Sequence, residues 1–347
     1  MTIQEVREKA KQTIGPHCKV CPECDGRACR GQIPGPGGKG TGSGFMRNYA
    51  DLRKIRLAMD TIYEPRPVST ETKLFGRTFS LPVFAAPVGA VGLHYSDAYN
   101  DLSYSAAVLK GCVRAGTAAF TGDGVKDEVF TGTIESIKAV GGVGFPTIKP
   151  WNVREVVAKA KLAEEAGAVA VAMDIDAAGL ILLAMQGKPV APMSVESLST
   201  IVRSISLPFI LKGIMTVEGA RKALEAGARG IVVSNHGGRV LDETPSTIEV
   251  LPDIVRAVGG KLTVMIDGGF RSGLDVFKAL ALGADGVLIG RPFTYAVYGG
   301  GEEGVFLTLE KIRAELAEAM LMTGARTLAD IDEKRISREP GNPDMTR

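Results

Sequence analysis

The part of the sequence best suited to proton transfer is a histidine between a strand-like apolar run and two glycines. His236 belongs to the run Ser234-Asn-His-Gly-Gly-Arg239, which follows the apolar residues 230–233. An imidazole changes charge near neutral pH and can act as a general base, and a guanidinium can bind a carboxylate through paired N–H donors. Asp176 follows another apolar run and is a candidate to orient the imidazole. We therefore expect a proton-transfer site for a substrate that carries a carboxylate.

Two further loops combine glycine with arginine in a way that suits a phosphate group. Asp267-Gly-Gly-Phe-Arg271 and Gly290-Arg291 each follow an apolar run. Backbone N–H groups at such loops, together with bidentate arginine donors, bind phosphate oxygens. Lys212 ends a further run, where a fixed cation stabilises negative charge on a neighbouring electron-accepting ring. It could equally pair with an acid such as Asp176 or Asp267, and the two roles are compatible.

Four of the five cysteines lie close together, in the spacing Cys18-x2-Cys21-x2-Cys24-x4-Cys29. In a reducing compartment such density is typical of a metal site. The first three cysteines resemble the iron–sulfur spacing of ferredoxins, although the fourth interval is longer, and four thiolates also suit tetrahedral zinc. Iron–sulfur, zinc, redox-active thiols and plain cysteines all stay open. Cys112 is expected to be a packed core residue.

From residue 81 onward, short apolar runs alternate with longer helical patterns. The segments between the runs, such as 153–166 and 217–226, are rich in Ala, Lys and Glu, have a helical period, and often end in glycine. Eight such units predict a (β/α)₈ TIM barrel over about residues 81–300, with its active site at the carboxyl ends of the strands. An open doubly wound sheet would need a glycine fingerprint after the first strand, and the residues there do not match it. The eight runs are Leu81–Ala86, Gly116–Phe120, Val143–Ile148, Val169–Ile175, Pro208–Leu211, Gly230–Val233, Leu262–Ile266 and Gly286–Ile289.

The N-terminal segment, residues 1–60, differs from the predicted barrel domain, residues 61–347. Thr2 and Glu5 form a capping box for a short helix, and the cysteines and the glycine-rich loop Gly35–Gly44 follow. The loop lacks the Gly-Lys-Ser/Thr frame of a P-loop and has the composition of an irregular connection. At the other end of the chain, a long helix over about residues 302–323 is expected to close the barrel domain.

The composition of the 347-residue chain excludes several functional classes. Lys and Arg total 41 and Asp and Glu 39, and this net charge of +2 gives no reason to expect nucleic-acid binding. The longest apolar stretches, such as Val83–Leu93, fall short of the roughly 18 residues of a membrane span, and the N-terminus lacks a signal-peptide apolar region. We expect a cytoplasmic protein with reduced cysteines and a small-molecule partner, without a nucleic-acid or membrane partner.

Taken together, these motifs resemble the signature of the FMN-dependent α-hydroxy-acid oxidases and dehydrogenases, the relatives of glycolate oxidase and lactate oxidase. The resemblance covers roughly residues 48–335 and does not extend to the cysteine cluster. It implies an FMN-containing TIM barrel that oxidises a 2-hydroxy acid to a 2-oxo acid, commonly as a homo-oligomer of tetramer size or larger. The motifs that carry it are Ser234-Asn-His-Gly-Gly-Arg-Val-Leu-Asp242 with Pro245-Ser246, Lys212-Gly-Ile, Asp267-Gly-Gly-Phe-Arg271-Ser-Gly and Gly290-Arg291-Pro.

The resemblance also implies roles for single residues. His236 is the implied active-site base, Asp176 its partner and Arg239 the ligand of the substrate carboxylate. Lys212 is implied to act beside the N1–C2 carbonyl side of the flavin. The residues implied to contact FMN are Pro87, Val88, Gly89, Thr121, Asp174, Lys212, Ser234, Asp267, Gly268, Gly269, Arg271, Gly290 and Arg291.

The residues expected around the substrate depart from the family pattern. A substrate tyrosine is usual near Gln32–Gly35, where this chain has none. The usual glutamine and tyrosine after the third strand are Pro146 and Ile148, and a frequent tryptophan after the second strand is Asp123. With Asp123 and Lys149 at the mouth, we expect a more polar or amine-bearing substrate than glycolate or lactate.

Two other functions stay open. One is an FMN-dependent isomerase that resembles type 2 isopentenyl-diphosphate isomerase and catalyses no net redox reaction. The other is a non-catalytic flavin electron-transfer subunit, which the missing tyrosines favour and the set of His236, Asp176 and Arg239 disfavours. If the cysteines hold a cluster, the expected partner is an electron-acceptor protein that takes flavin electrons in place of O₂.

Overall fold

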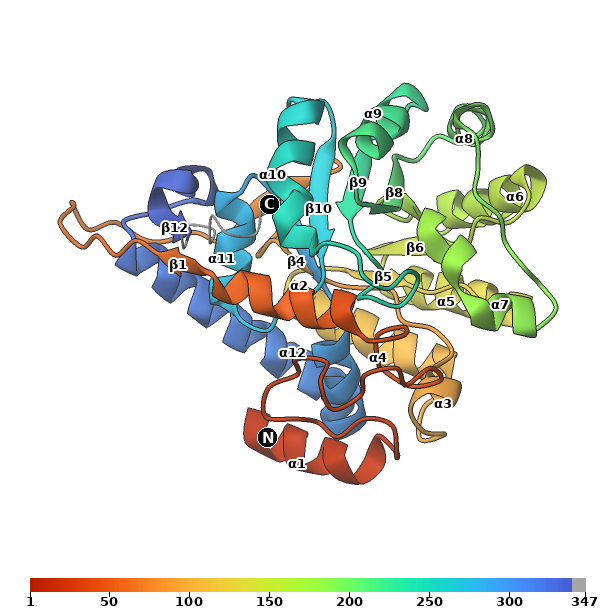
Figure 1. Cartoon of the computed structure of the whole chain (residues 1–347), viewed down its shortest axis with the longest axis horizontal. Helices are drawn as coiled ribbons and strands as arrows, with labels where there is room; N and C mark the ends of the chain where they lie inside the picture. The colour runs from red at the N-terminus through yellow and green to blue at the C-terminus, as the bar shows by residue number, and fades with distance from the viewer. Residues whose placement is uncertain (339–347) are drawn as a thin grey trace, which may run out of the picture.

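The computed structural model describes residues 1–338, and its centre is a closed barrel of eight strands. Neighbouring strands are parallel and follow one another in chain order, and the last strand pairs with the first. Figure 1 shows strands in the middle of the molecule with helices around them. Each predicted apolar run overlaps one strand, so the TIM-barrel prediction is confirmed. Continuous apolar runs mark these strands because both of their faces are buried. The barrel strands are β4 Val83–Ala85, β5 Ala119–Thr121, β6 Gly144–Ile148, β7 Val171–Asp174, β8 Phe209–Ile214, β9 Gly230–Val233, β10 Thr263–Asp267 and β11 Gly286–Ile289.

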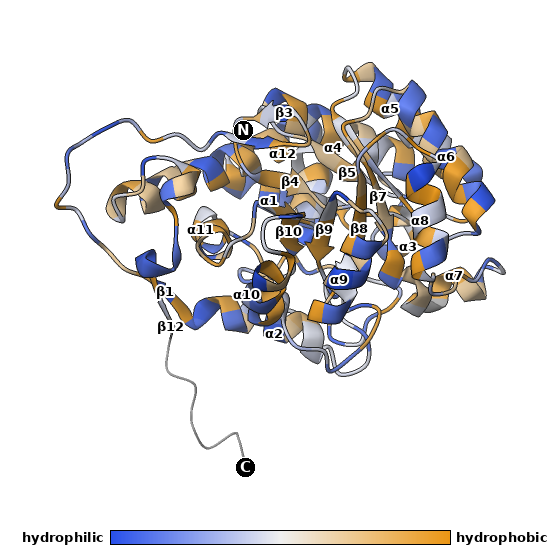
Figure 2. Ribbon diagram, turned by 90° about the horizontal axis from the view of Figure 1, so that it is seen from above, coloured by the Kyte–Doolittle hydropathy of each residue, from blue (hydrophilic) through white to orange (hydrophobic). Residues whose placement is uncertain are grey.

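Helices surround the barrel, and polar N-cap residues start several of them. The side chains of Asn100, Ser194 and Thr216 each accept a backbone N–H of the first helical turn. Figure 2 shows hydrophobic strands in the interior, whereas hydrophilic residues lie on the outer parts of the helices. The helices of the barrel are α4 Asp101–Arg114, α5 Asp127–Ala139, α6 Val153–Glu165, α8 Val195–Arg203, α9 Val217–Glu225, α10 Thr247–Val258, α11 Gly273–Ala281 and α12 Arg291–Met322, with α3 Val91–His94, η1 Ile175–Gly179 and α7 Ile181–Met185 in the connections.

The last helix begins earlier than the sequence predicts. The expected helix covers about residues 302–323, whereas α12 starts at Arg291 and is interrupted at Gly301, where φ is 55° and ψ is −136°. The part before the interruption completes the eighth strand–helix unit, and the part after it is the predicted helix. Glycines at 299–301 obscured the first part, because glycine disfavours helix. None of the helices within residues 1–338 combines the length and apolar composition that crossing a bilayer requires.

The N-terminal segment packs against the barrel helices. α1 (Ile3–Thr13) begins with the predicted capping box, because Glu5 N–H donates to Thr2 Oγ1 and Thr2 N–H donates to Glu5 Oε2. α1 lies so close to α12 that a Cβ at Gly299 would come within 1.9 Å of a backbone oxygen of α1. α2 (Ser43–Arg53) follows the glycine-rich loop and contacts α10. The division into domains at residue 60 stays a prediction.

A hairpin closes the amino-terminal end of the barrel. It consists of β2 (Thr72–Leu74) and β3 (Arg77–Phe79), and the Phe75 ring at its turn lies against Gly230, the first residue of β9. Any ligand must therefore enter from the other end of the barrel. The remaining short elements are β1 Ile55–Leu57, which pairs antiparallel with β12 Ile336–Arg338, and the 3₁₀ turns Leu328–Asp330 and Glu333–Arg335.

Aromatic side chains fill the interior between this hairpin and the carboxyl ends of the strands. The rings of Phe120 and Phe145 stack with centroids 4.5 Å apart, and Phe84 meets Phe145 edge-on at 5.7 Å. All three side chains are buried. Such ring pairs stabilise a core beyond the area that they bury.

We predict that Phe145→Ala lowers the free energy of unfolding by about 3–5 kcal/mol, because it leaves a cavity in this cluster. Phe306→Ala is the control, since that ring is only half-buried, on α12. The control should lose clearly less stability in urea unfolding followed by circular dichroism. Equal losses would contradict the central place of the cluster in the core.

Candidate active site

A cavity of about 1300 Å³ opens at the carboxyl ends of the barrel strands. A typical small-molecule site has roughly 300–1,000 Å³, so this one has room for a cofactor together with a substrate. Residues of the glycine-rich loop, α3 and α7 form its outer wall. The predicted site residues that line the cavity are Pro87, Val88, Gly89, Asp123, Lys149, Asp174, Lys212, His236, Arg239, Asp267, Gly268, Gly269, Arg271, Gly290 and Arg291, whereas Thr121, Asp176 and Ser234 do not line it.

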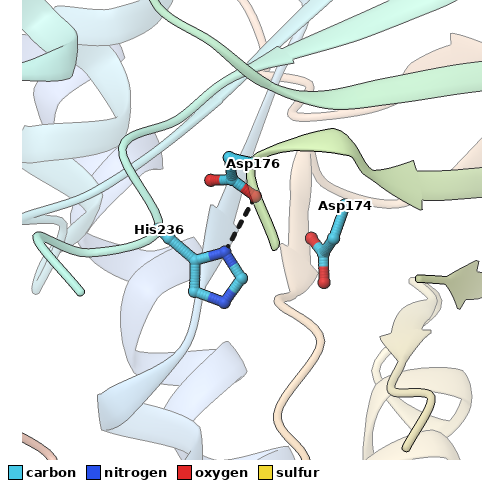
Figure 3. A group of neighbouring side chains, drawn as sticks. All are labelled: Asp174, Asp176 and His236. Atoms are coloured by element: carbon cyan, nitrogen blue, oxygen red, sulfur yellow. Dashed lines mark hydrogen bonds and ion pairs between the residues drawn. The ribbon is translucent and has the colours of Figure 1, made fainter. Parts of the chain in front are cut away.

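A carboxylate holds one nitrogen of the predicted base. His236 Nδ1 lies 3.0 Å from Asp176 Oδ1, and the second nitrogen of the ring points away from this carboxylate (Figure 3). An ionised carboxylate only accepts hydrogen bonds, so in the neutral ring Nδ1 carries the proton and Nε2 keeps its lone pair. Gly213 in β8 makes the pairing possible, since a Cβ there would come within 2.6 Å of the Asp176 side chain. Nε2 is therefore the atom that can take up a proton.

The backbone around His236 is held in an uncommon conformation. His236, Gly237 and Gly238 have φ values of 56°, 63° and 77°, which lie in the left-handed region. The His236 N–H donates to Ser234 Oγ at 3.1 Å. A Cβ at Gly238 would come within 2.4 Å of the Phe45 nitrogen in α2, so this contact requires glycine. The turn that carries the imidazole is therefore held by Ser234 before it and by the contact of Gly238 with α2 after it.

Two lysines and two aspartates form a buried network beside the imidazole. Lys149 Nζ lies 2.6 Å from Asp174 Oδ2, and Lys212 Nζ lies 3.1 Å from Asp174 Oδ1 and 3.5 Å from Asp267 Oδ2. Burial would raise the pKa of Asp174, but the two ammonium groups outweigh it and hold that pKa well below its usual value. Burial would lower the pKa of Lys212, but the carboxylates of Asp174 and Asp267 raise it. Burial raises the pKa of Asp267, against the opposing effect of Lys212. Lys212 therefore remains a cation at the cavity wall.

Asp174 also lies near the pair of Asp176 and His236. One ligand atom from each of the three side chains lies within 4.8 Å of the others, a spacing that a metal ion can bridge (Figure 3). The ammonium groups of Lys149 and Lys212 already neutralise Asp174 and would repel a divalent cation. The arrangement favours proton transfer over metal binding.

Arg239 is anchored by the glycine-rich loop. Its Nη1 donates to the carbonyl oxygens of Gly35 at 2.7 Å and Gly37 at 2.9 Å, and its Nη2 lies 3.2 Å from His94 Nε2. Burial and the charge of Arg239 lower the pKa of His94 to about 3, so this ring is neutral and its Nδ1 accepts the Gly35 N–H at 3.0 Å. Burial and Arg291 lower the pKa of Arg239 to about 10, which still leaves it charged at neutral pH. Since a guanidinium has five N–H groups, Arg239 keeps donors for a ligand.

Asp123 lines the cavity as expected, but neighbouring groups already engage its carboxylate. Its carboxylate accepts the backbone N–H groups of Gly124 at 2.9 Å and Lys149 at 3.1 Å. It also accepts the Trp151 indole N–H at 2.6 Å and forms an ion pair with Lys159 at 2.8 Å. The residue is only 4% exposed. Asp123 therefore ties the loops after β5 and β6 to α6, and these contacts leave its charge neutralised.

The two predicted phosphate ligands contact the N-terminal segment. Arg271 Nε and Nη2 donate to the Cys24 carbonyl at 3.1 and 2.7 Å. Arg291 Nε donates to the Pro36 carbonyl at 2.7 Å, and its Nη2 donates to the Gly237 carbonyl at 3.1 Å. Both side chains still line the cavity and keep further N–H groups. One end of the cavity therefore carries two cations that can meet an anion.

Polar atoms in and behind the cavity wall fit a ligand with a polar ring and a phosphate. Thr121 Oγ1 and Asp267 Oδ1 are buried and have no hydrogen-bond partner within residues 1–338. Buried polar atoms normally have partners, and since Asp267 lines the cavity, a bound group is expected to supply one to its Oδ1. Gly268 and Gly269 have a further reason to be glycine, because a Cβ there would come within 2.7 and 2.0 Å of Asn48. With Lys212 beside this wall, the residues present fit FMN.

Comparison with known proteins agrees with this fit. A family model described as FMN-dependent dehydrogenase matches residues 36–182 and 181–338. The chain belongs to this family. 4-Hydroxymandelate oxidase of Amycolatopsis orientalis is 33% identical over 87% of this chain and 94% of its own length. L-lactate dehydrogenase of Pectobacterium atrosepticum is also 33% identical, over 83% of this chain and 87% of its own length.

Solved structures of relatives share the fold of this chain. A crystal structure of mandelate oxidase superimposes with a TM-score of 0.81 at 29% identity, covering 98% of both chains. Mandelate oxidase with benzoyl-formic acid gives a TM-score of 0.78 at 30% identity, also over 98% of both chains. The predictions of an FMN cofactor and an oxidoreductase are therefore confirmed, and these matches give no support to the isomerase alternative.

The four N-terminal cysteines precede the region that the family model matches. They surround a cavity of about 30 Å³ next to Arg291, and each is a half-buried free thiol. Arg271 Nη2 lies 3.6 Å from Cys24 Sγ. Cys112 is buried in the core, as predicted. The cysteine cluster thus adjoins the end of the cofactor cavity that carries the two arginines.

The sequence reasoning missed Trp151 and Lys159 as partners of Asp123. A signal was present, because Lys159 falls on the helix face that also carries Val156, Ala160 and Ala163. A lysine on an otherwise apolar face of a helix indicates a buried partner. The sequence also gave no indication that the glycine-rich loop forms a wall of the cavity, because its composition indicates only an irregular connection.

We predict that His94→Asn reduces the acid sensitivity of the fold. The pKa of His94 is about 3 in the folded chain and about 6.5 in an unfolded one, so between these values the unfolded chain binds more protons. Stability is then lost as the pH falls below 6.5, by about 2 kcal/mol at pH 5. Asparagine still offers an acceptor to the Gly35 N–H but does not titrate. The drop in Tm between pH 7 and pH 5 should be smaller in the variant, and equal drops would contradict the neutral state of His94.

Proposed function

We propose that this FMN-dependent dehydrogenase oxidises 2-hydroxy acids to 2-oxo acids. The observation that carries the proposal is the His236–Asp176 pair, which engages Nδ1 and leaves Nε2 without a contact to this carboxylate, at the cavity that Arg239 also lines. A carboxylate bound to Arg239 brings the neighbouring α-carbon and its hydroxyl toward a positioned base. FMN, when bound, supplies the acceptor for the two electrons that leave the substrate.

His236 is proposed as the base in either order of bond breaking. Its Nε2 takes the hydroxyl proton if the α-hydrogen leaves with its electron pair, or takes the α-proton if a carbanion forms. Both routes place a positive charge on the imidazole, and the Asp176 carboxylate at 3.0 Å stabilises that charge. Arg239 keeps the substrate oriented through charge-assisted hydrogen bonds to its carboxylate.

The proposed cofactor site has a phosphate end and a ring end. Arg271 and Arg291, with the glycines of the two loops after β10 and β11, are proposed to hold the phosphate. Lys212 is proposed to stand beside the ring, where its positive charge stabilises negative charge on the flavin. The other proposed FMN contacts are Pro87, Val88, Gly89, Thr121, Asp174, Ser234, Asp267, Gly268, Gly269 and Gly290.

We propose that the substrate has a bulky apolar side chain. Leu93, Leu180, Leu183 and Met185 line the outer part of the cavity. The charge of Lys149 is paired with Asp174 at 2.6 Å, and a lysine likewise neutralises Asp123. These contacts argue against the amine-bearing substrate that the sequence indicated, because the Asp123 carboxylate on which that expectation rested is already paired with Lys159. 4-Hydroxymandelate oxidase and mandelate oxidase are named for hydroxy acids with an aromatic side chain, which agrees with this wall.

Other aspects of the function remain proposals that follow from the sequence and the family resemblance. We propose that Cys18, Cys21, Cys24 and Cys29 are metal ligands and that an electron-acceptor protein takes electrons from the enzyme. A homo-oligomer of tetramer size or larger and a cytoplasmic location are also proposed. Size-exclusion chromatography with light scattering tests the oligomer directly.

We predict that His236→Ala binds FMN but reduces it about 10²–10⁴-fold more slowly when a 2-hydroxy acid is added, because general-base catalysis is lost. Anaerobic stopped-flow absorbance of the flavin band measures the rate. His17→Ala, which changes a histidine outside the cavity lining, should keep the rate. Unchanged flavin reduction in His236→Ala would refute the proposed base.

We predict that 2-hydroxyheptanoate is a better substrate than 6-amino-2-hydroxyhexanoate, which has the same number of side-chain atoms but ends in an ammonium group. The expected ratio of kcat/KM is at least about tenfold, because the aliphatic side chains at the cavity favour an apolar chain and Asp123 is already paired with Lys159. Lactate should fall below 2-hydroxyheptanoate as well, since it leaves the outer cavity unfilled. A higher kcat/KM for 6-amino-2-hydroxyhexanoate would contradict the proposed apolar substrate and support the amine-bearing substrate expected from the sequence.

A further inference from the structure

The cysteine cluster is built into the fold through its backbone. Arg7 Nη2 donates to the Cys21 carbonyl at 2.5 Å, and Arg271 donates twice to the Cys24 carbonyl. The Cys29 carbonyl lies so close to Gly37 that a Cβ at Gly37 would come within 1.9 Å of it. Three of the four cysteines are therefore positioned by groups outside their own loop. Such a fixed backbone is expected of a preorganised ligand site and not of a mobile terminal segment.

The thiols do not lie at the spacing of ligands to one tetrahedral ion. Within residues 1–338, no three cysteine sulfurs lie within 4.8 Å of one another. Zinc with Zn–S bonds of about 2.3 Å needs sulfurs roughly 3.8 Å apart. The sulfurs instead surround a common cavity of about 30 Å³, which exceeds the roughly 10–15 Å³ that one water-sized particle needs. The arrangement suits a core of several atoms held between the thiolates.

Positive charge is available where four thiolates would need it. Arg271 Nη2 lies 3.6 Å from Cys24 Sγ, and Arg291 lines the same small cavity as all four cysteines. The same two arginines also line the large cavity at its proposed phosphate end. Hydrogen bonds and cations near the sulfurs stabilise an anionic iron–sulfur core.

We propose that Cys18, Cys21, Cys24 and Cys29 bind an iron–sulfur cluster, and that Arg271 and Arg291 couple this cluster to the phosphate end of the FMN site. The second part rests on the proposed function, because it requires the FMN phosphate to lie at these arginines. The first part stands on the cysteines alone. Loss of the cluster frees the Cys24 carbonyl from its fixed position, and Arg271 then loses an anchor that aims it at the phosphate.

The test of the cluster is the metal content of full-length protein purified without oxygen. Iron and acid-labile sulfide should occur in equal amounts, several atoms of each per chain, and dithionite should bleach a broad absorbance near about 400 nm in protein from which FMN has been removed. Cys18→Ser and Cys24→Ser should each lose most of the iron. Cys112→Ser is the matched control, since Cys112 is a core cysteine outside the cluster, and it should retain the iron.

Two results would overturn the cluster. One is a single zinc per chain without labile sulfide, which would assign the thiols to a tetrahedral ion. The other is protein that stays free of iron after anaerobic treatment with ferrous iron and sulfide, which would leave redox-active or plain thiols. If the serine variants do not fold, iron binding to the wild-type chain still decides between these outcomes.

The coupling is tested by FMN affinity, measured by fluorescence titration of the chain after removal of FMN. The Kd should rise at least about fivefold in Cys24→Ser and stay unchanged in Cys112→Ser. Riboflavin, which lacks the phosphate, should bind equally to all three proteins. An equal loss of affinity for FMN and riboflavin would show general damage and overturn the coupling. An unchanged Kd for FMN would also overturn it, whether or not 2-hydroxy acids are oxidised.

Discussion

The structure of the barrel mouth depends on a network of buried charges. Removing any one of them leaves its partners buried with one counter-charge fewer. Asp174 lies between the ammonium groups of Lys149 and Lys212, and Lys212 also reaches Asp267. Removing one partner of a buried ion pair leaves a charge without solvent, which costs about 3–5 kcal/mol, although an intact pair contributes little net stability. The four residues come from the ends of strands β6, β7, β8 and β10 or directly follow them. The network therefore fixes the relative positions of these strand ends and keeps Lys212 as a cation at the cavity wall.

The need of buried charges for partners also explains the position of the N-terminal segment. Three arginines converge on the cavity, and the charge of Arg291 already lowers the pKa of Arg239. Guanidinium groups this close need acceptors on every side, and backbone carbonyls supply them without adding a competing negative charge. A segment rich in glycine can bring carbonyls this near because it carries few side chains. The acceptors are Gly35 and Gly37 for Arg239, Cys24 for Arg271, and Pro36 and Gly237 for Arg291.

Much of the fold follows from local pattern, whereas much of the site depends on pairing at long range. The eight strands were predictable because strands buried on both faces are continuous apolar runs, and the capping box of Thr2 and Glu5 is a contact between near neighbours. The first half of α12 was not predictable from the sequence, because its packing against α1 outweighs the low helix propensity of glycine. Motif order predicted the pairing of His236 with Asp176, because carboxyl ends of parallel strands meet at one edge. No local pattern could tell that Lys159 neutralises Asp123, since the two residues lie 36 positions apart.

The contrast between local pattern and long-range pairing also distinguishes the proposed cofactor part of the cavity from the proposed substrate part. The residues proposed for the cofactor stand at strand ends, where barrel closure determines their positions, so a sequence motif is sufficient to find them. The residues proposed for the substrate come from loops and short helices, where two charged side chains can cancel each other and leave an apolar surface. Asp123 and Lys149 are each neutralised by a partner in this way, so charge that looks available in the sequence is already paired in the fold. Substrate class in such a barrel must therefore be inferred from the charges that keep free hydrogen-bonding groups. On that basis we propose that Arg239 binds the substrate carboxylate and that the aliphatic residues of the cavity contact the rest of the molecule.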